Sequence, residues 1–133
     1  KDTYVAAKDA HYSAKNYRLS DENGSQVIEL DVVINGETQR LRGEGNGPIS
    51  AILNALQLPI DVLNYEERSI SSGAHAKALA LIELQVQGTG KSAFGAGVHD
   101  NIVTSSIEAI IAATNRLIDQ GVLSTEQVIA AAV

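Results

Sequence analysis

One pattern of elements occurs twice along the chain, and this duplication limits the fold more than any other feature. In each half, segments typical of β-strands lead to two glycines separated by one residue, and a helical pattern follows. The glycine pairs are Gly43 with Gly45 and Gly95 with Gly97. A three-stranded sheet with one helix to cover it is a stable two-layer arrangement. The sequence therefore predicts an α+β domain built from a duplicated βββα unit with pseudo-two-fold symmetry.

The first repeat is expected at about residues 16–58. The dipeptide Asn35-Gly36 is the strongest two-residue hairpin signal, because both central residues of such a turn need positive φ. Residues 43–48 then break the strand pattern, and Pro48 suits the first turn of a helix that extends to about Gln57. Strands are expected at residues 16–20, 26–34 and 38–42.

The second repeat is expected at about residues 60–121. Residues 76–86 suit a strand or a helix by propensity, but the glycine-rich segment 88–91 after them favours a hairpin. A long helix is expected from about residue 101 to 120, with Asp100 as its N-cap and Gly121 as its stop. This half is completed by a strand at residues 60–70, a turn at 71–73 and a strand at 92–95.

The two ends of the chain are expected to lie outside the repeats. Residues 1–15 mix charged residues with alanine, and we interpret them as a linker or a loosely attached first strand. Residues 124–127 form a capping box, which predicts a short C-terminal helix to Val133. The chain begins with Lys1 rather than Met, which indicates a piece of a longer protein.

Composition and charge narrow the class of protein. The 133 residues suffice for one domain, and a hydrophobic fraction of 44% supplies a core. Ten Lys and Arg against sixteen Asp and Glu give a net charge of -6, which argues against nucleic acid as a partner. No apolar run approaches the roughly 20 residues that span a bilayer, so no membrane partner is expected. Cysteine is absent, which excludes disulfides and cysteine nucleophiles.

Two glycine-rich segments resemble nucleotide-binding motifs, but neither has the required context. The segment Gly88-Thr-Gly-Lys-Ser92 would need a glycine where Gln85 stands and a long helix after the lysine to form a P-loop. The segment Gly43-Glu-Gly-Asn-Gly47 has the wrong spacing for a dinucleotide fingerprint, and a hairpin precedes it. We therefore expect a hairpin turn at the first and no dinucleotide site at the second.

No arrangement of side chains indicates catalysis or metal binding. The histidines His11, His75 and His99 lack metal-ligand spacing, and the last two follow glycine-rich turns, where exposed polar residues are common. Glu66 and Glu67 point to opposite faces of a strand, so they cannot cooperate as acid and base. We expect no catalytic residue, no metal site and no cofactor in this domain.

One segment has the geometry of an anion site. Gly45-Asn46-Gly47-Pro48 leads into a helix, and the free N–H groups and positive dipole end at a helix start attract groups such as a carboxylate. The same residues also suit a strand-to-helix turn that serves geometry alone. The residues by themselves leave both interpretations open.

Five motifs taken together resemble one family. They are Gly43-Glu-Gly-Asn-Gly-Pro48, Tyr65-Glu-Glu-Arg-Ser-Ile-Ser-Ser-Gly73, Phe94-Gly-Ala-Gly-Val98, Asn101-Ile-Val-Thr-Ser-Ser106 and Ala112-Ala-Thr-Asn-Arg116. Over about residues 17–117 the chain is similar to the C-terminal regulatory domain of 2-isopropylmalate synthase, the first committed enzyme of leucine biosynthesis. Each motif is weak alone, whereas the set is fairly specific.

This resemblance implies a homodimer of regulatory domains in the cytoplasm, with L-leucine bound near the dimer interface as feedback inhibitor. It also implies a partner in the catalytic barrel of the parent synthase. The metal-binding histidines and the acetyl-CoA site of that barrel have no counterpart in these residues. The resemblance therefore implies a regulatory domain that is not itself an enzyme.

The resemblance also implies which residues bind the effector. Backbone amides near Asn46 and Gly47 are expected to hold the leucine carboxylate, and Asp100 or main-chain carbonyls the ammonium. The residues expected to shape the pocket for the side chain are Ile49, Val98 and Ile102. The whole set comprises Gly45, Asn46, Gly47, Pro48, Ile49, Ser50, Tyr65, Ala76, Ala78, Val98, Asp100 and Ile102.

Three departures from the family pattern concern the effector more than the fold. Arg68 stands where histidine is frequent, Phe94 where tryptophan is frequent, and Ser50 where an acidic or small residue is usual. Citramalate and homocitrate synthases use the same kind of domain, and one methylene changes binding by only about 1–3 kcal/mol. The alternatives are therefore a domain of those synthases that senses another amino acid, and a ligand-free structural dimerisation module.

Overall fold

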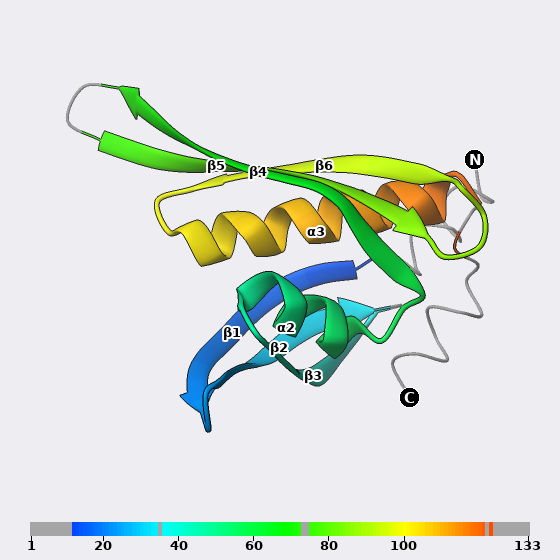
Figure 1. The fold of residues 1–133 in the computed structure, drawn as a ribbon, viewed down its shortest axis with the longest axis horizontal. Helices are drawn as coiled ribbons and strands as arrows, with labels where there is room; N and C mark the ends of the chain where they lie inside the picture. The colour runs from blue at the N-terminus through cyan, green and yellow to red at the C-terminus, as the bar shows by residue number, and fades with distance from the viewer. Residues whose placement is uncertain (1–11, 35, 73–74, 122, 124–133) are drawn as a thin grey trace. The chain divides into compact units, whose positions relative to one another are not determined.

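The computed structural model describes residues 12–34, 36–72, 75–121 and 123. They form two compact units: the second comprises Ile60–Leu117, and the first comprises the residues through Pro59 together with those from Ile118 onward. Each unit has three strands followed by a helix, in the order β1, β2, β3, α2 and then β4, β5, β6, α3 (Figure 1). The predicted α+β class and the duplicated βββα order are confirmed.

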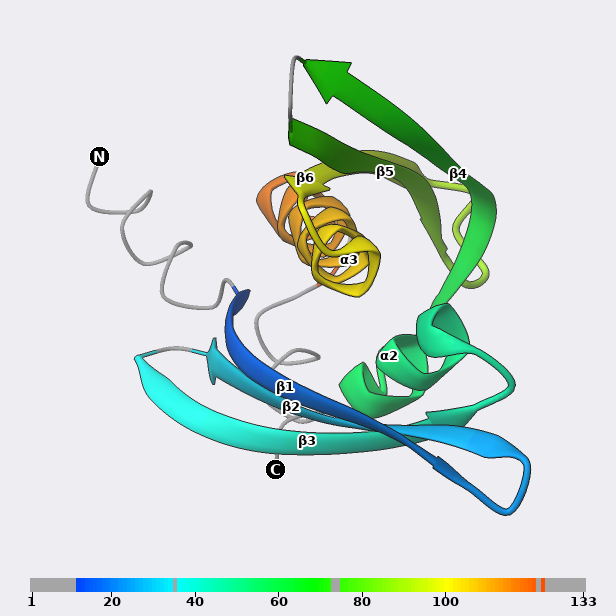
Figure 2. The same ribbon diagram turned by 90° about the vertical axis from the view of Figure 1, so that its left-hand side faces the viewer.

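In the first unit, α2 covers one face of an antiparallel sheet of order β1-β2-β3 (Figure 2). Its elements are β1 (Tyr12–Glu22), β2 (Ser25–Ile34), β3 (Glu37–Gly45) and α2 (Pro48–Leu56). Alternate residues of β2, such as Ile28 and Leu30, are fully buried, as expected for a sheet covered on one side. Pro48 lies at the start of α2 as predicted, and Gln57 ends the helix in a left-handed backbone conformation.

In the second unit, an antiparallel sheet of order β4-β5-β6 packs against α3. Its elements are β4 (Ile60–Ser72), β5 (His75–Val86), β6 (Ser92–His99) and α3 (Ile102–Asp119). Residues 76–86 are a strand, as the hairpin signal after them predicted, and Ile82 and Leu84 on its helix side are buried. Gly121, with φ of 76°, donates its N–H to the carbonyl of Ile118 at 3.0 Å and stops α3, as predicted.

Both glycine pairs lie inside strands. The prediction that residues 43–48 break the strand pattern is therefore wrong for residues 43–45. Strand β3 continues to Gly45, and β6 continues through Gly97 to His99. A Cβ on Gly43 would lie 2.1 Å from the carbonyl oxygen of Ala51 in α2. One on Gly95 would lie 2.1 Å from the carbonyl oxygen of Ala109 in α3. The glycines therefore allow each helix backbone to lie directly against its strand.

Other boundaries differ by a few residues. Strand β1 begins at Tyr12, which is 3% exposed and pairs with Ile34, so it includes residues 12–15 of the predicted linker or loosely attached strand. Strand β4 continues to Ser72, where a turn was expected, because it pairs with β5 as far as His75. Residues 1–11, Asn35 and the helix expected at 124–133 lie outside the described residues.

The glycine-rich segment 88–91 is a hairpin turn between β5 and β6, as predicted. The N–H of Val86 donates to the carbonyl of Lys91 at 3.0 Å, and the Thr89 hydroxyl donates to the carbonyl of Val86 at 2.9 Å. A P-loop would continue from the lysine into a helix, whereas a strand begins at Ser92.

Candidate functional site

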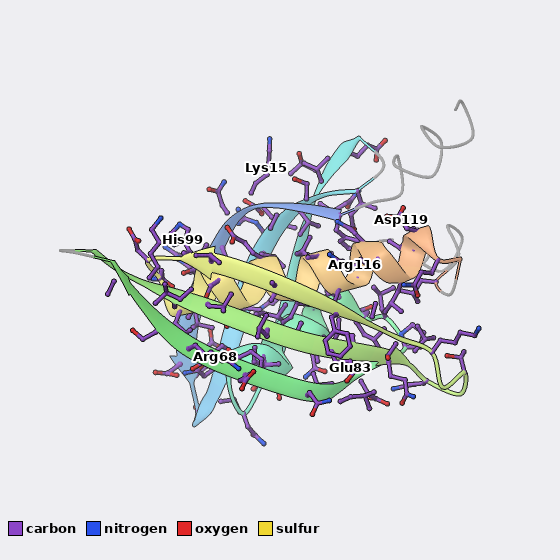
Figure 3. The ribbon with its side chains drawn as sticks, turned by 90° about the horizontal axis from the view of Figure 1, so that it is seen from above. Lys15, Arg68, Glu83, His99, Arg116 and Asp119 are labelled. Carbon is purple, nitrogen blue, oxygen red and sulfur yellow. The ribbon has the colours of Figure 1, made fainter. Side chains whose placement is uncertain are left out.

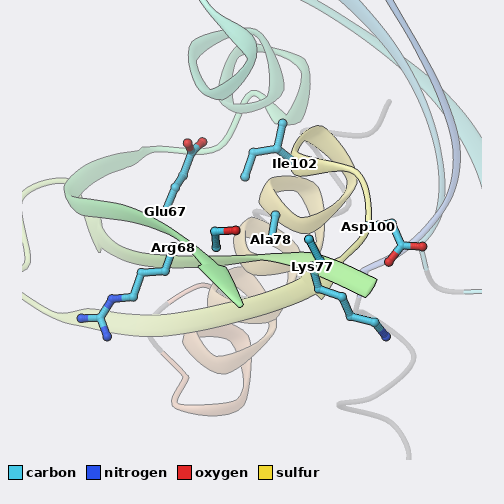
Figure 4. A pocket seen from close by; sticks show the side chains of 8 residues that line it. Glu67, Arg68, Lys77, Ala78, Asp100 and Ile102 are labelled. Carbon is cyan, nitrogen blue, oxygen red and sulfur yellow. The ribbon is translucent and has the colours of Figure 1, made fainter. Parts of the chain in front are cut away.

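A pocket of about 340 Å³ opens on the second unit, where the β4–β5 hairpin meets the start of α3. Small-molecule pockets measure about 300–1,000 Å³, so this one suits a small metabolite better than a nucleotide. In Figure 4, Ala78 and Ile102 lie at the centre of the lining residues. The pocket is lined by Glu67, Arg68, Ser69, Ala76, Lys77, Ala78, Asp100 and Ile102.

The register of the β4–β5 hairpin brings the lining together. Ser69 lies opposite Ala78, and Glu67 lies two residues along the same face of β4. The alanine side chain leaves space that a larger residue would fill, and Ile102 in the first turn of α3 is 37% exposed. The centre of the pocket is therefore apolar.

The Glu67 carboxylate is held by a neighbouring tyrosine. The Tyr65 hydroxyl donates to Glu67 and shares a hydrogen bond of 2.7 Å with the Ser106 hydroxyl of α3. Burial, and then the hydrogen bond to Glu67, raise the pKa of Tyr65 to about 12. The hydroxyl thus stays protonated at neutral pH and fixes the direction of the carboxylate at the pocket wall.

The lining carries charges of both signs. Glu67 and Asp100 are anionic, and Arg68 and Lys77 are cationic. The Arg68 guanidinium lies 3.2 Å from the Glu66 carboxylate and points away from the pocket centre (Figure 4). Lys77 forms no ion pair among the residues that the structure describes. Opposite charges around an apolar centre match a zwitterion with an apolar side chain, which is the chemistry of a hydrophobic amino acid.

The amides at the start of α3 are already used. The Asn101 side-chain oxygen accepts hydrogen bonds from the N–H groups of Val103 at 2.8 Å and Thr104 at 3.1 Å. The N-cap is therefore Asn101, and the prediction of Asp100 at this position is wrong. The Asn101 N–H itself donates to Nδ1 of His99 at 3.0 Å. Asp100, one residue before the cap, lines the pocket instead.

The start of α2, in the first unit, has a different chemistry. Its N-cap is Gly47, no side chain caps it, and Pro48 has no N–H to offer. A Cβ on Gly45 would lie 2.5 Å from the Cβ of Ser50, so Gly45 serves the contact between β3 and α2. The first turn of α2 thus keeps backbone N–H groups without a side-chain cap, and these can donate hydrogen bonds to a carboxylate.

The predicted effector-binding residues divide between the two units. Gly45, Asn46, Gly47, Pro48, Ile49 and Ser50 lie at the junction of β3 and α2. In the second unit, Ala76, Ala78, Asp100 and Ile102 line the pocket. Tyr65 positions the lining residue Glu67. Val98 is 46% exposed on the opposite face of the sheet, because the alternating Gly95 and Gly97 face α3.

The sequence prediction did not include four lining residues: Glu67, Arg68, Ser69 and Lys77. The signal that could have identified them is the hairpin register. The pairing of Ser72 with His75 places Ser69 opposite Ala78, and the two-residue period of a strand then adds Glu67. The predicted turn at 71–73 would have given a different register. Glu66 and Glu67 do lie on opposite faces, as predicted. Glu66 accepts a hydrogen bond from Arg68, whereas Glu67 accepts one from Tyr65.

Two further properties concern the described part of the chain. Within it, no three His, Asp or Glu side chains lie close enough together to hold a metal ion. None of its helices combines the length and the apolar character that a membrane crossing requires.

Comparison with known proteins identifies close relatives. The family model described as the LeuA allosteric (dimerisation) domain matches residues 1–118. The 2-isopropylmalate synthase of Azoarcus sp. (strain BH72) is 44% identical over 117 residues, which cover 88% of this chain and 20% of that protein. The 2-isopropylmalate synthase of Paraburkholderia xenovorans (strain LB400) is 41% identical over 83% of this chain and 19% of its own length. The chain thus spans about a fifth of these relatives.

Proposed function

Because the chain belongs to the family of LeuA allosteric (dimerisation) domains, we propose that it binds L-leucine as the feedback inhibitor of a 2-isopropylmalate synthase. The observation that carries the proposal is the family match over residues 1–118. The pocket adds support, because its size and charges suit an apolar amino acid. In this proposal the domain forms a homodimer, works in the cytoplasm and is not itself an enzyme. The catalytic barrel lies in the part of the parent that these residues do not cover.

Each part of the amino acid has a partner in the second unit. The leucine side chain packs against Ala78 and Ile102, and the ammonium binds the carboxylate of Glu67 or Asp100. Tyr65 prepares Glu67 for this contact by holding it in one direction. The carboxylate partner in this unit is the Lys77 ammonium. The uncapped first-turn amides of α2 are a separate candidate site for a carboxylate, in the first unit.

Inhibition requires that leucine distinguish two states of the parent enzyme. A ligand with equal affinity for both states shifts neither, however tightly it binds. Each tenfold preference for the inhibited arrangement of domain and barrel corresponds to about 1.4 kcal/mol. Leucine must therefore contact groups whose positions differ between the two arrangements.

Equilibrium dialysis with labelled leucine tests the site. Ala78→Leu fills the centre of the pocket, and we expect it to weaken binding at least about a hundredfold, since overpacking costs roughly 1–3 kcal/mol and the ligand loses its space as well. Ala14→Leu is the matched control, because Ala14 is exposed on β1 of the first unit. Unchanged binding in Ala78→Leu would exclude the pocket.

Two more variants distinguish the two candidate sites for the carboxylate, one in each unit. Lys77→Ala removes the cation, and Gly47→Asp places a competing carboxylate at the uncapped start of α2. A variant that weakens leucine binding while the dimer stays intact identifies the site, because each change leaves the other candidate intact. If neither variant weakens binding, both assignments are wrong.

Two alternatives remain. A domain from a citramalate or homocitrate synthase would bind another amino acid more tightly than leucine. A ligand-free dimerisation module would form a dimer whose thermal stability does not respond to any amino acid. The relatives are 2-isopropylmalate synthases, which favours a parent of that kind.

A further inference from the structure

The β4–β5–β6 sheet has one face against α3 and one face exposed. Along β6, Gly95 and Gly97 face the helix, so Phe94, Ala96 and Val98 point the other way. Phe94 is 60% exposed and Val98 46%. Beside them on β5 lie Leu79 and Leu81, both half-buried. Figure 3 looks onto this face, with Arg68 and Glu83 labelled. We call this surface, formed by outward residues of all three strands, the outer face of the second sheet.

The fold does not require an apolar surface here, as the first unit shows. Gly43 pairs with Ile28 on β2, and Gly95 pairs with Ile82 on β5, so the two sheets can be aligned residue by residue. In this alignment, the position of Phe94 is occupied by Arg42 and that of Ala96 by Glu44. The charged side chains of the first sheet pair with neighbours: Arg40 with Asp31 at 2.8 Å, and Arg42 with Glu22 at 3.4 Å. Because large exposed apolar patches mark interaction sites, the difference assigns a partner to the second sheet.

The order of charges along β5 indicates what that partner is. Its outward residues are Lys77, Leu79, Leu81 and Glu83, which are a cation, two leucines and an anion. Lys77 also borders the pocket, because it lies near the hairpin end of β5. Neutral donors on Asn64 and Ser92 hydrogen-bond the Glu83 carboxylate, each at 2.7 Å, and no cation pairs with it in the described residues. When a second copy of this strand lies over the first in the opposite direction, each cation meets an anion and the leucines meet each other.

We propose that this outer face binds the same face of a second copy of the chain about a two-fold axis that crosses β5 between Leu79 and Leu81. The axis lies in the plane between the stacked sheets, so the two β5 strands run in opposite directions. Lys77 of each copy then lies over Glu83 of the other, and Leu79 over Leu81. An axis parallel to β5 would instead place Lys77 over Lys77. The inference rests on the homodimer of the proposed function and names its surface.

The neighbouring strands follow the same symmetry. On β4, Arg68 and Glu66 lie beside the two leucines, so the axis places Arg68 of one copy over Glu66 of the other. On β6, Val98 and Ala96 lie beside the same leucines, so the larger side chain faces the smaller one. Charge and size are therefore complementary on all three strands.

A charge exchange on β5 tests this arrangement. The dimer dissociation constant of the full chain is measured by sedimentation equilibrium without leucine. Lys77→Glu and Glu83→Lys each create two like-charge contacts, and we expect each to weaken the dimer roughly tenfold or more. The double variant Lys77→Glu/Glu83→Lys restores opposite charges across the axis and is expected to recover most of the loss. The two residues lie at opposite ends of the outward series on one strand, so recovery cannot come from a contact within the chain.

A second pair of variants uses the first unit as control. Phe94→Arg is expected to yield monomers, whereas Arg42→Ala, at the aligned position, is expected to leave the dimer unchanged. A folded dimer that none of the β5 and β6 variants weakens would overturn the surface while leaving the homodimer intact. Failure of the double variant to restore the dimer would overturn the two-fold arrangement. A wild-type chain that is monomeric at every concentration would overturn both the surface and the homodimer.

Discussion

The two units share one frame, which is a three-stranded sheet with a helix packed on it, and differ in the side chains that this frame carries. Both hold their helix through a glycine pair on the third strand, and both bury an isoleucine opposite the first of those glycines, Ile28 and Ile82. They differ at the helix start, where Asn101 caps α3 but no side chain caps α2. They also differ on the outer faces, where Arg42 stands in one and Phe94 in the other. Features common to both units serve the fold, and features found in one unit are the candidates for function.

The largest expected effect concerns the shared frame. Gly43→Ala and Gly95→Ala each introduce a Cβ 2.1 Å from a helix carbonyl oxygen, and the contact is with backbone, which cannot rotate away. We expect each variant to lose roughly 3 kcal/mol of unfolding free energy in urea, or to fail to fold. Gly47→Ala, with no atom within 4 Å of the new Cβ, is the control and should be tolerated. Wild-type stability in Gly95→Ala would show that helix and strand are not in close contact.

The next effect concerns stability at high pH and one tyrosine in each unit, Tyr12 and Tyr65. Burial raises the pKa of Tyr12 to about 12, and burial with the Glu67 hydrogen bond raises the pKa of Tyr65 to about 12, from 10.0 in both cases. The unfolded chain releases these protons near pH 10 while the folded chain retains them, so their stabilisation is complete below pH 10 and is lost as pH rises towards 12. Urea unfolding across this range should show a smaller loss in Tyr65→Phe than in the wild type. An equal loss would mean that Tyr65 titrates normally.

A smaller effect concerns the helix starts. Asn101→Ala removes the cap of α3 and should cost about 1 kcal/mol of unfolding free energy. Gly47→Asn adds a side-chain cap to α2 and should raise stability by a few tenths of that amount, because glycine is itself an acceptable N-cap. Thermal unfolding of both variants measures the difference. If Asn101→Ala is neutral, the contrast between the two helix starts is not real.

The smallest effect concerns the charged outer face of the first unit. The hydrogen bond from Arg40, followed by its charge, holds the pKa of the Asp31 carboxyl below its ordinary value of 3.8. The stabilisation is therefore present above pH 3.8 and is lost as pH falls through the folded value. Arg40→Gln should raise the pKa of Asp31 in an NMR titration, and an unchanged pKa would mean that the pair does not form in solution.

Most of the frame follows from local sequence signals. The hairpin at Gly36, the proline at the start of α2 and the glycine after α3 each act on the backbone near them, and each appears where it was predicted. The glycine pairs were misinterpreted as the end of a strand, because their role depends on how closely the helix after each strand packs back onto it. Local pattern cannot reveal that contact.

The site was predicted less completely than the frame, for a similar reason. Ala78 and Ile102 entered through the family resemblance, and both line one pocket together with Asp100. Glu67 and Lys77 were missed because their place depends on the hairpin register, which shifts when the turn moves by one residue. The outer face of the second sheet became visible only when the two sheets were aligned through their pairing.

Calorimetric titration of the purified chain with leucine, isoleucine and valine tests the central claim most directly. A leucine-sensing domain predicts saturable heat with leucine and at least roughly tenfold weaker binding of the other two, within the range that one methylene can provide. Tighter binding of isoleucine would indicate a regulatory domain of another synthase. If a folded dimer in the calorimeter cell gives no binding heat with any of the three amino acids, the regulatory function is contradicted. The domain would then be a structural dimerisation module.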